Sequence, residues 1–176
     1  QATAWGHELE SLGTMHVLHA CHKQAVPKVV IGGSVLVYGA HPQNPNFLRE
    51  DAPTRGLGGA HFVADKLDVE TQAKRFQETH PECAVTLLRM ATVLGPTSQN
   101  YVSRWLSRSI VQTVLGYDPL VQFVHEVDAI AALKLAVDRN VRGVFNIASE
   151  GVLPISTVVK LVGRLATYLQ GYGDVL

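Results

Sequence analysis

The sequence contains little cysteine, no excess of either charge and no long apolar run. Lysine plus arginine and aspartate plus glutamate both number 15 in 176 residues, so the formal net charge is zero and a nucleic-acid surface is not indicated. Two cysteines, Cys21 and Cys83, are too few for a disulfide framework and favour a reducing compartment. The longest apolar stretch, VVIGGSVLVYGA, falls short of the roughly 20 residues that span a bilayer.

The N-terminal residues QATAWGHELESLG also show no basic region followed by an apolar one, as a signal peptide would. These absences together predict a cytoplasmic protein that binds neither nucleic acid nor membrane.

The apolar content of 47% is typical of a chain that folds around a core. Short apolar runs alternate with amphipathic helical patterns, and continuous apolar strands belong to parallel sheets covered on both sides. The sequence therefore predicts an α/β fold, a parallel sheet with helices on both faces. The predicted helices lie at residues 7–24, 59–79, 101–115, 126–137 and 156–169, and the predicted strands at 29–31, 83–90, 120–125 and 143–149.

The stretch GLGGAHFVADKLDVE begins like a phosphate-binding glycine loop. A dinucleotide fingerprint needs a strand directly before its first glycine, so that the following helix points at the pyrophosphate. The polar loop REDAPTR stands there instead, and His61 occupies the third glycine position. We therefore interpret Gly56 and Gly58 as parts of an ordinary loop that enters a helix.

Three histidines at three-residue steps, His16, His19 and His22, stand beside Cys21. Ligands at i and i+3 can share a helix face, but a closed metal site needs about four ligands and no later Cys/His pair completes one. We predict no metal site and interpret these histidines as a solvated or partner-facing surface.

Two polar residues are placed where chemistry could occur. Ser34 follows the first predicted strand, at the end where open α/β sheets bind ligands, although an ordinary loop serine would look the same. The segment GGSVLVYG is not a nucleophile elbow, because Leu36 replaces the second glycine. Lys66 follows Phe62 by one helical turn, so its amine either reaches solvent past apolar neighbours or reaches a ligand.

Five stretches resemble the extended short-chain dehydrogenase/reductase family, which includes NAD-dependent epimerases and dehydratases such as UDP-galactose 4-epimerase. ESLGTMHVLHAC resembles the family's Asn-x-x-Gly-Thr helix, and KVVIGGSVLVYG its strand ending in Ser-Ser-x-x-Val-Tyr-Gly. FVADK resembles Tyr-x-x-x-Lys, and VTLLRMATVLGP resembles Leu-Arg-x-x-Asn-Val-Tyr-Gly-Pro. VQFVHEVDAIAAL with GVFNIAS resembles the family's distal pair. Their order and separation over residues 10–149 carry the resemblance.

The resemblance implies the C-terminal part of a Rossmann-type fold. Residues 1–96 would form the second half of the dinucleotide-binding domain, and 97–176 a partial substrate region with strands returning to the main sheet. It implies NAD or NADP as cofactor and a nucleotide sugar or similar hydroxyl or carbonyl compound as substrate. The family's Gly-x-x-Gly-x-x-Gly loop is absent here, so we expect a missing N-terminal segment, or a homodimer through helices 7–24 and 59–79.

The resemblance also implies roles for single residues. Ser34 matches the family serine, which hydrogen-bonds the reacting oxygen, and Lys66 matches the lysine that holds the nicotinamide ribose. Phe62 stands at the position of the tyrosine that moves the proton. Implied cofactor contacts come from Lys66, Met90, Thr92 and Val93, and implied substrate contacts from Ser34 and Thr92.

Several positions depart from the family. Phe62 has no ionisable oxygen, and a positioned acid/base group contributes roughly 10²–10⁴-fold to rate. Glu10 replaces an asparagine of the family. Thr92 replaces a second asparagine, and Leu94 replaces a tyrosine. Val121 stands where several epimerases carry a diphosphate-binding arginine.

These departures leave two hypotheses. One is an NAD(P)-dependent epimerase/dehydratase-type oxidoreductase impaired at its acid/base position. The other is a catalytically silent nucleotide-binding or regulatory protein on the same scaffold. A nucleic-acid-binding derivative of the fold has little support at zero net charge.

Overall fold

The computed structural model describes residues 6–169, which fall into two compact units. The first holds the chain up to Ala91 together with Val127–Ile147, and the second holds Thr92–Glu126 together with the chain from Ala148 onward. The first unit therefore ends a few residues before the expected boundary at residue 96, and a later helix and strand return to it. The assignment of cofactor and substrate roles to these parts stays a prediction.

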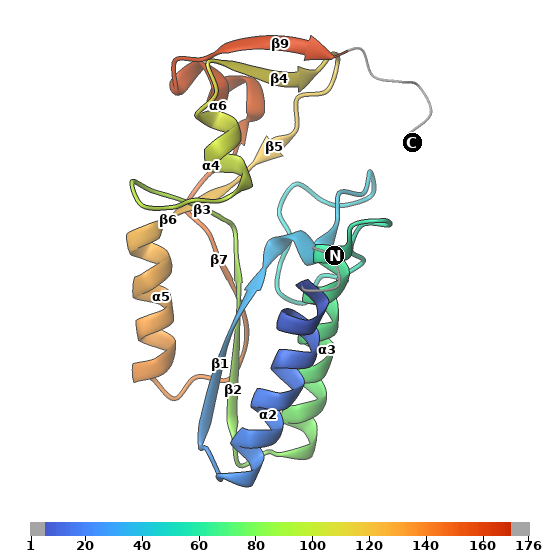
Figure 1. Cartoon of the computed structure of the whole chain (residues 1–176), viewed down its shortest axis with the longest axis vertical. Coiled ribbons are helices and arrows are strands. Elements are labelled where there is room, and N and C mark those ends of the chain that lie inside the picture. Colours follow the sequence, from blue (N-terminus) through green and yellow to red (C-terminus); the bar gives the residue numbers. More distant parts are fainter. Residues whose placement is uncertain (1–5, 170–176) are drawn as a thin grey trace. The chain divides into compact units, whose positions relative to one another are not determined.

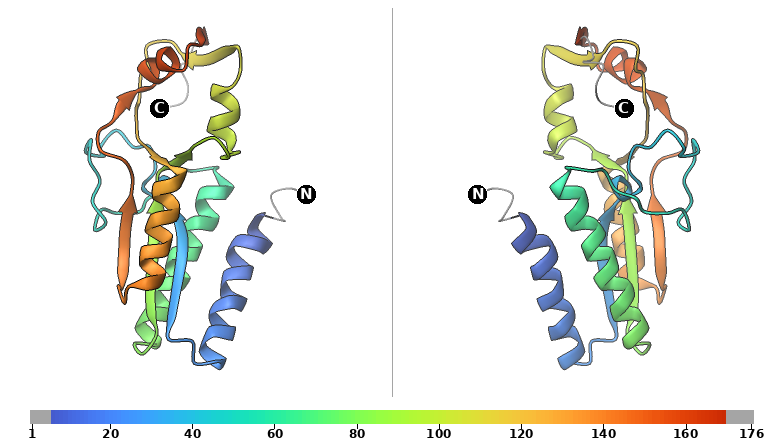
Figure 2. Two further views of the ribbon diagram at one scale, coloured as in Figure 1. Left: turned by 90° about the vertical axis from the view of Figure 1, so that its left-hand side faces the viewer. Right: turned by 90° about the vertical axis from the view of Figure 1, so that its right-hand side faces the viewer.

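A parallel three-stranded sheet of order β1-β2-β7 forms the centre of the first unit. Helices α2 and α3 lie on one side of this sheet and α5 on the other (Figures 1 and 2). The predicted parallel sheet with helices on both faces is thus confirmed. The elements are β1 (Lys28–Ser34), α2 (Gly13–Lys23), α3 (His61–Thr79), β2 (Ala84–Met90), α5 (Glu126–Asp138, in this unit from Val127) and β7 (Gly143–Ile147).

The core of this unit lies between α2, α3 and the sheet. Its buried cluster consists of Leu18, Ala73, Phe76, Cys83 and Val85. Leu18 is buried, whereas its neighbour Val17 is exposed. A helix turns by about 100° per residue, so only one of these neighbours can face the sheet directly.

The thiol of Cys83 should be chemically protected. Burial raises the pKa of Cys83, and the thiolate is the reactive form. Cys21 is only partly buried and carries the other free thiol. We expect a disulfide reagent to modify Cys21 in the native protein and Cys83 only after denaturation, measured by mass spectrometry. Native Cys21→Ser protein that reacted as fast as the denatured protein would contradict this prediction.

The second unit consists of short paired strands and two short helices. Within it, β3 (Thr92–Leu94) pairs with β6 (Phe123–His125) and β4 (Ile110–Val114) with β9 (Leu165–Leu169), both in parallel. β5 (Leu120–Val121) pairs with β8 (Leu153–Pro154) in antiparallel fashion. The helices are α4 (Tyr101–Leu106) and α6 (Ile155–Leu161).

Two sequence predictions in this unit are wrong in part. The helix predicted for 101–115 ends at Leu106, and the helix predicted for 156–169 ends at Leu161. The residues that follow each helix form β4 and β9, which pair with each other and bury Val111 completely. Short apolar runs suit a helix or a strand, and a partner far along the chain decides between them. Among the helices described for residues 6–169, none is long and apolar enough to cross a membrane.

Candidate functional site

The carboxyl ends of β1 and β2 bring two predicted site residues together. Ser34 and Met90 are register partners at the last position of each strand, and Met90 also pairs with Ile147 of β7. The Oγ of Ser34 accepts a hydrogen bond from the Leu36 N–H at 3.3 Å and starts the 3₁₀ turn η2 (Val35–Tyr38). Ligands of open parallel sheets bind beyond this end of the strands.

Helix α3 carries the other two predicted positions to the same end of the sheet. Because α3 connects the end of β1 to the start of β2, it runs back along the sheet, and its first turns lie at the carboxyl end. Phe62, Lys66 and Glu70 follow each other at four-residue steps on one face of α3. A Cβ atom on Gly33 would lie 3.6 Å from Oε1 of Glu70, and Lys66 comes one turn earlier, toward the end that bears Ser34.

The amine of Lys66 is held by a carboxylate. Its Nζ donates a hydrogen bond to Oε2 of Glu10 at 2.6 Å and lies 5.5 Å from the centroid of the Phe62 ring. The Lys66 side chain is 13% exposed, whereas that of Glu10 is 37% exposed. The sequence left open whether this lysine reaches solvent or a ligand, and it did not indicate an ion pair with Glu10.

Glu10 belongs to a π-helical turn, η1 (Glu8–Leu12), that leads into α2. Such turns are rare and occur often at functional sites. Polar contacts attach this turn to α3 on both sides of the ion pair: Nδ1 of His7 lies 2.8 Å from Oδ1 of Asp65, and the Ser11 hydroxyl donates to Asp68. These contacts fix the position of the Glu10 carboxylate relative to Lys66.

The ring of Phe62 carries no hydroxyl at the position where the family resemblance implies a tyrosine. Phe62 is 52% exposed, so its ring is accessible, but it cannot exchange a proton. The phenol of Tyr38 is buried, donates to Oδ1 of Asn146 at 2.7 Å and accepts from Nη1 of Arg89 at 2.8 Å. Tyr38 is therefore engaged in structural hydrogen bonds.

Sequence reasoning missed a buried ion pair between the sheet and α3. Nε and Nη2 of Arg89 donate to the Glu70 carboxylate at 3.0 and 2.7 Å, and both side chains are nearly inaccessible to solvent. Burial alone would lower the pKa of Arg89, but hydrogen bonds to Glu70 and Tyr38 outweigh it and keep the pKa above its ordinary value. The sign of this ion pair in the sequence was an arginine within the apolar segment LLRM of β2.

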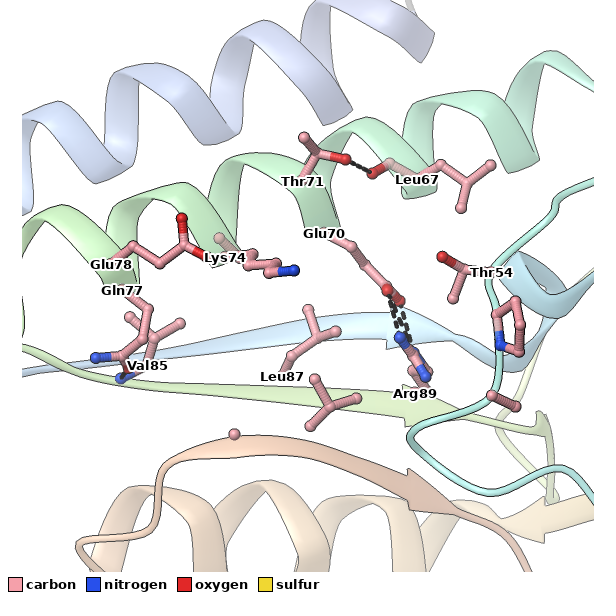
Figure 3. A pocket seen from close by; sticks show the side chains of 15 residues that line it. Thr54, Leu67, Glu70, Thr71, Lys74, Gln77, Glu78, Val85, Leu87 and Arg89 are labelled. Atoms are coloured by element: carbon pink, nitrogen blue, oxygen red, sulfur yellow. Dashed lines mark hydrogen bonds and ion pairs between the residues drawn. The ribbon is translucent and has the colours of Figure 1, made fainter.

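A cavity of about 670 Å³ lies between α3, the sheet and residues 52–54 (Figure 3). Its lining includes the Glu70–Arg89 pair and apolar residues such as Leu87, with Lys74 and Glu78 contributed by α3. Ser34, Phe62, Lys66 and Met90 are not part of this lining. The cavity is thus separate from the group of predicted site residues.

The glycines near residue 56 allow two backbone segments to cross closely. Gly39 and Gly56 have positive φ angles of 72° and 64°, and the Gly56 N–H donates to the carbonyl of Val37 at 2.8 Å. A Cβ atom on Gly39 would lie 1.8 Å from the Gly56 carbonyl oxygen. These contacts give the glycines a packing role and agree with the interpretation of this segment as a loop.

The remaining predicted positions belong to other elements of the chain. Thr92 and Val93 belong to β3 of the second unit, where they pair with Phe123 and Val124. His16, His19 and His22 are exposed on α2. In the part of the chain that the structure describes, no three or more His, Cys, Asp or Glu side chains are grouped to hold a metal ion.

Comparison with known proteins identifies the family. Residues 7–148 match the NAD dependent epimerase/dehydratase family. The chain belongs to this family. The predicted resemblance is therefore confirmed, and the fold of the first unit is the one expected of an epimerase/dehydratase.

Relatives of this epimerase/dehydratase chain are longer than it is. An uncharacterised protein of Mycobacterium tuberculosis is 35% identical over 167 residues, which are 94% of this chain and 44% of that protein. Short-chain dehydrogenase/reductase family 42E member 1 of Xenopus laevis is 26% identical over 137 residues, 72% of this chain and 35% of that protein. The chain thus spans less than half the length of these relatives.

Solved structures show the same fold. MoeE5 in complex with UDP-glucuronic acid and NAD is 27% identical, with a TM-score of 0.79 over 94% of this chain and 59% of that chain. UDP-glucose 4-epimerase of Thermus thermophilus, in complex with NAD, is 19% identical, with a TM-score of 0.79 over 96% and 60%. At 19% identity, the likeness to the Thermus thermophilus enzyme concerns the fold alone.

Proposed function

We propose that the protein binds NAD or NADP and acts as an epimerase/dehydratase-type oxidoreductase on a nucleotide sugar or a similar hydroxyl or carbonyl compound. The observation that carries the proposal is the placement of Ser34, Met90 and Lys66 at the carboxyl end of one parallel sheet, in a chain of this family. MoeE5, with UDP-glucuronic acid and NAD in one structure and UDP-glucose and NAD in another, supports the choice of ligands.

The residues present fit the nicotinamide side of such a cofactor site. Lys66 offers an ammonium group beside an accessible aromatic ring, and Ser34 offers a hydroxyl at the mouth of the sheet. When bound, the dinucleotide supplies the redox chemistry. In the proposal Lys66 holds the ribose, Met90, Thr92 and Val93 contact the cofactor, and Ser34 and Thr92 orient the substrate.

A second candidate is a catalytically silent nucleotide-binding or regulatory protein. Two observations favour it: Phe62 brings no proton-exchanging group, and the amine of Lys66 is already paired with Glu10. This candidate keeps the dinucleotide site and gives up turnover. The two candidates therefore differ in catalysis and agree on binding.

Calorimetric titration of the full-length protein with NAD⁺ and NADP⁺ tests what the candidates share. We expect one dinucleotide to bind and Lys66→Met to weaken its binding at least about tenfold, because a charged hydrogen-bond donor is lost. Lys74→Met, on the same helix but away from Lys66, should leave the affinity unchanged. Failure of both dinucleotides to bind would overturn the proposal. Where one of them binds, turnover of a panel of sugar nucleotides separates the two candidates.

We also propose that the protein forms a homodimer through the helical segments at 7–24 and 59–79. Leu9, Leu12 and Met15 expose apolar side chains at three-residue steps along the first of them. In sedimentation velocity the full-length protein should be dimeric and its Leu12→Lys variant monomeric, because a charge in an apolar interface is costly to bury. Val17→Lys, on another side of α2, should remain dimeric. A wild-type monomer at all concentrations would contradict this assembly.

A further inference from the structure

Lys66 forms an ion pair beside the Phe62 ring. Within residues 6–169 its ionic partner is Glu10, at 2.6 Å, and the aromatic ring beside its amine belongs to Phe62 and carries no ionisable group. The pair Glu10–Lys66 is therefore neutral as a whole. Without Glu10, the mostly buried Lys66 ammonium beside the Phe62 ring would lose this opposite charge.

The position of the Glu10 carboxylate is defined, and ligands can reach it. Contacts of His7 with Asp65 and of Ser11 with Asp68 hold η1 against α3 on both sides of it. The carboxylate side chain remains 37% exposed, whereas the Lys66 side chain is 13% exposed. A molecule bound beside Lys66 would therefore experience both charges of the pair.

A nicotinamide ring is a charged ligand in only one oxidation state. The oxidised ring is a cation and the reduced ring is neutral, so an uncompensated ammonium nearby would repel the oxidised form alone. Two unit charges a few ångströms apart near a protein surface interact strongly enough to change an equilibrium by about tenfold or more. A carboxylate paired with that ammonium removes most of this repulsion.

We propose that Glu10 determines which oxidation state of the nicotinamide dinucleotide the site prefers: by neutralising Lys66, it permits tight binding of the oxidised, cationic form. The inference rests on the proposed function, since it requires the dinucleotide to bind beside Lys66. It assigns Glu10 a specificity role through charge, and it requires no contact between Glu10 and the reacting atoms.

The test is the ratio of dissociation constants for the oxidised and the reduced dinucleotide, measured by calorimetry on the full-length protein. Glu10→Gln should raise this ratio about five- to tenfold, a range that allows for the partial exposure of the carboxylate. Glu8→Gln, which removes the same charge from an exposed position of the same turn, should leave the ratio within about twofold of wild type.

Two further variants test the remaining combinations of the Glu10 and Lys66 charges. Glu10→Gln combined with Lys66→Gln removes both charges and should return the ratio close to the wild-type value, although both affinities fall. Lys66→Gln alone leaves the carboxylate uncompensated and should lower the ratio, which provides an independent test where Glu10→Gln does not fold.

Each outcome has a distinct meaning. Equal losses of affinity for both oxidation states in Glu10→Gln would assign Glu10 a structural role and overturn this inference, while the proposed function would stand. A Lys66→Gln variant with an unchanged ratio would overturn it as well. If the wild-type protein bound neither form, the proposed function would fail, and this inference with it.

Discussion

Replacing Phe62 with tyrosine should raise turnover of a sugar-nucleotide substrate by the full-length protein about 10²–10⁴-fold, the contribution of a positioned acid/base group. The amine of Lys66 lies 5.5 Å from the centroid of the Phe62 ring. A phenol at this position supplies the proton-exchanging group that Phe62 lacks. The measurement is NAD(P)-linked initial rate at saturating cofactor.

The control for this substitution is Phe47→Tyr, which adds the same hydroxyl to an exposed ring in the loop before α3. It should leave the rate unchanged. Dinucleotide affinity should change less than about twofold in Phe62→Tyr, because the expected gain lies in proton transfer. Rapid turnover by the wild-type protein, with no gain from tyrosine, would show that another group carries the proton.

Replacing Arg89 with methionine should destabilise the protein by about 3–5 kcal/mol, the usual effect of removing one partner of a buried ion pair. The change would leave the Glu70 carboxylate buried without a cation and Tyr38 without its hydrogen-bond donor. The measurement is the free energy of unfolding of the full-length protein from guanidinium denaturation, followed by circular dichroism.

Two variants make this prediction specific. Arg75→Met removes an exposed arginine from α3, the helix that carries Glu70, and should change the stability by less than about 0.5 kcal/mol. Arg89→Met combined with Glu70→Leu removes both charges and should recover part of the loss, since replacement of a whole buried pair is often neutral. A loss below about 1 kcal/mol in Arg89→Met would contradict the structural role of the pair.

The parts of the fold that depend on local pattern could be predicted from the sequence. Continuous apolar runs predicted β2 and β7, and helical periodicity predicted α3, whose buried residues include Val69, Ala73 and Phe76. The pair β4–β9 could not be predicted, because each strand follows a short helix and is stabilised by a partner more than 50 positions away. Apolar periodicity carries no information about such pairing.

The candidate site, like the fold, could be predicted from the sequence only in part. Motif spacing placed Ser34 and Lys66 in related positions, and β1, β2 and α3 carry them to one end of the sheet. The Glu10–Lys66 contact joins residues 56 positions apart and depends on a π-helical turn. Sequence patterns do not predict such a turn, so the contact could not be predicted. The sequence indicated only that Glu10 departs from the family. The structure shows where that carboxylate lies.

The most direct test is a crystal structure of the full-length protein grown with saturating NAD⁺ or NADP⁺. The account predicts electron density for the nicotinamide ribose within hydrogen-bonding distance of Lys66 Nζ, about 2.7–3.2 Å, with the ring beside Phe62 and Ser34 at the end of β1. A dinucleotide bound elsewhere, with Lys66 and Glu10 remote from it, would contradict the account.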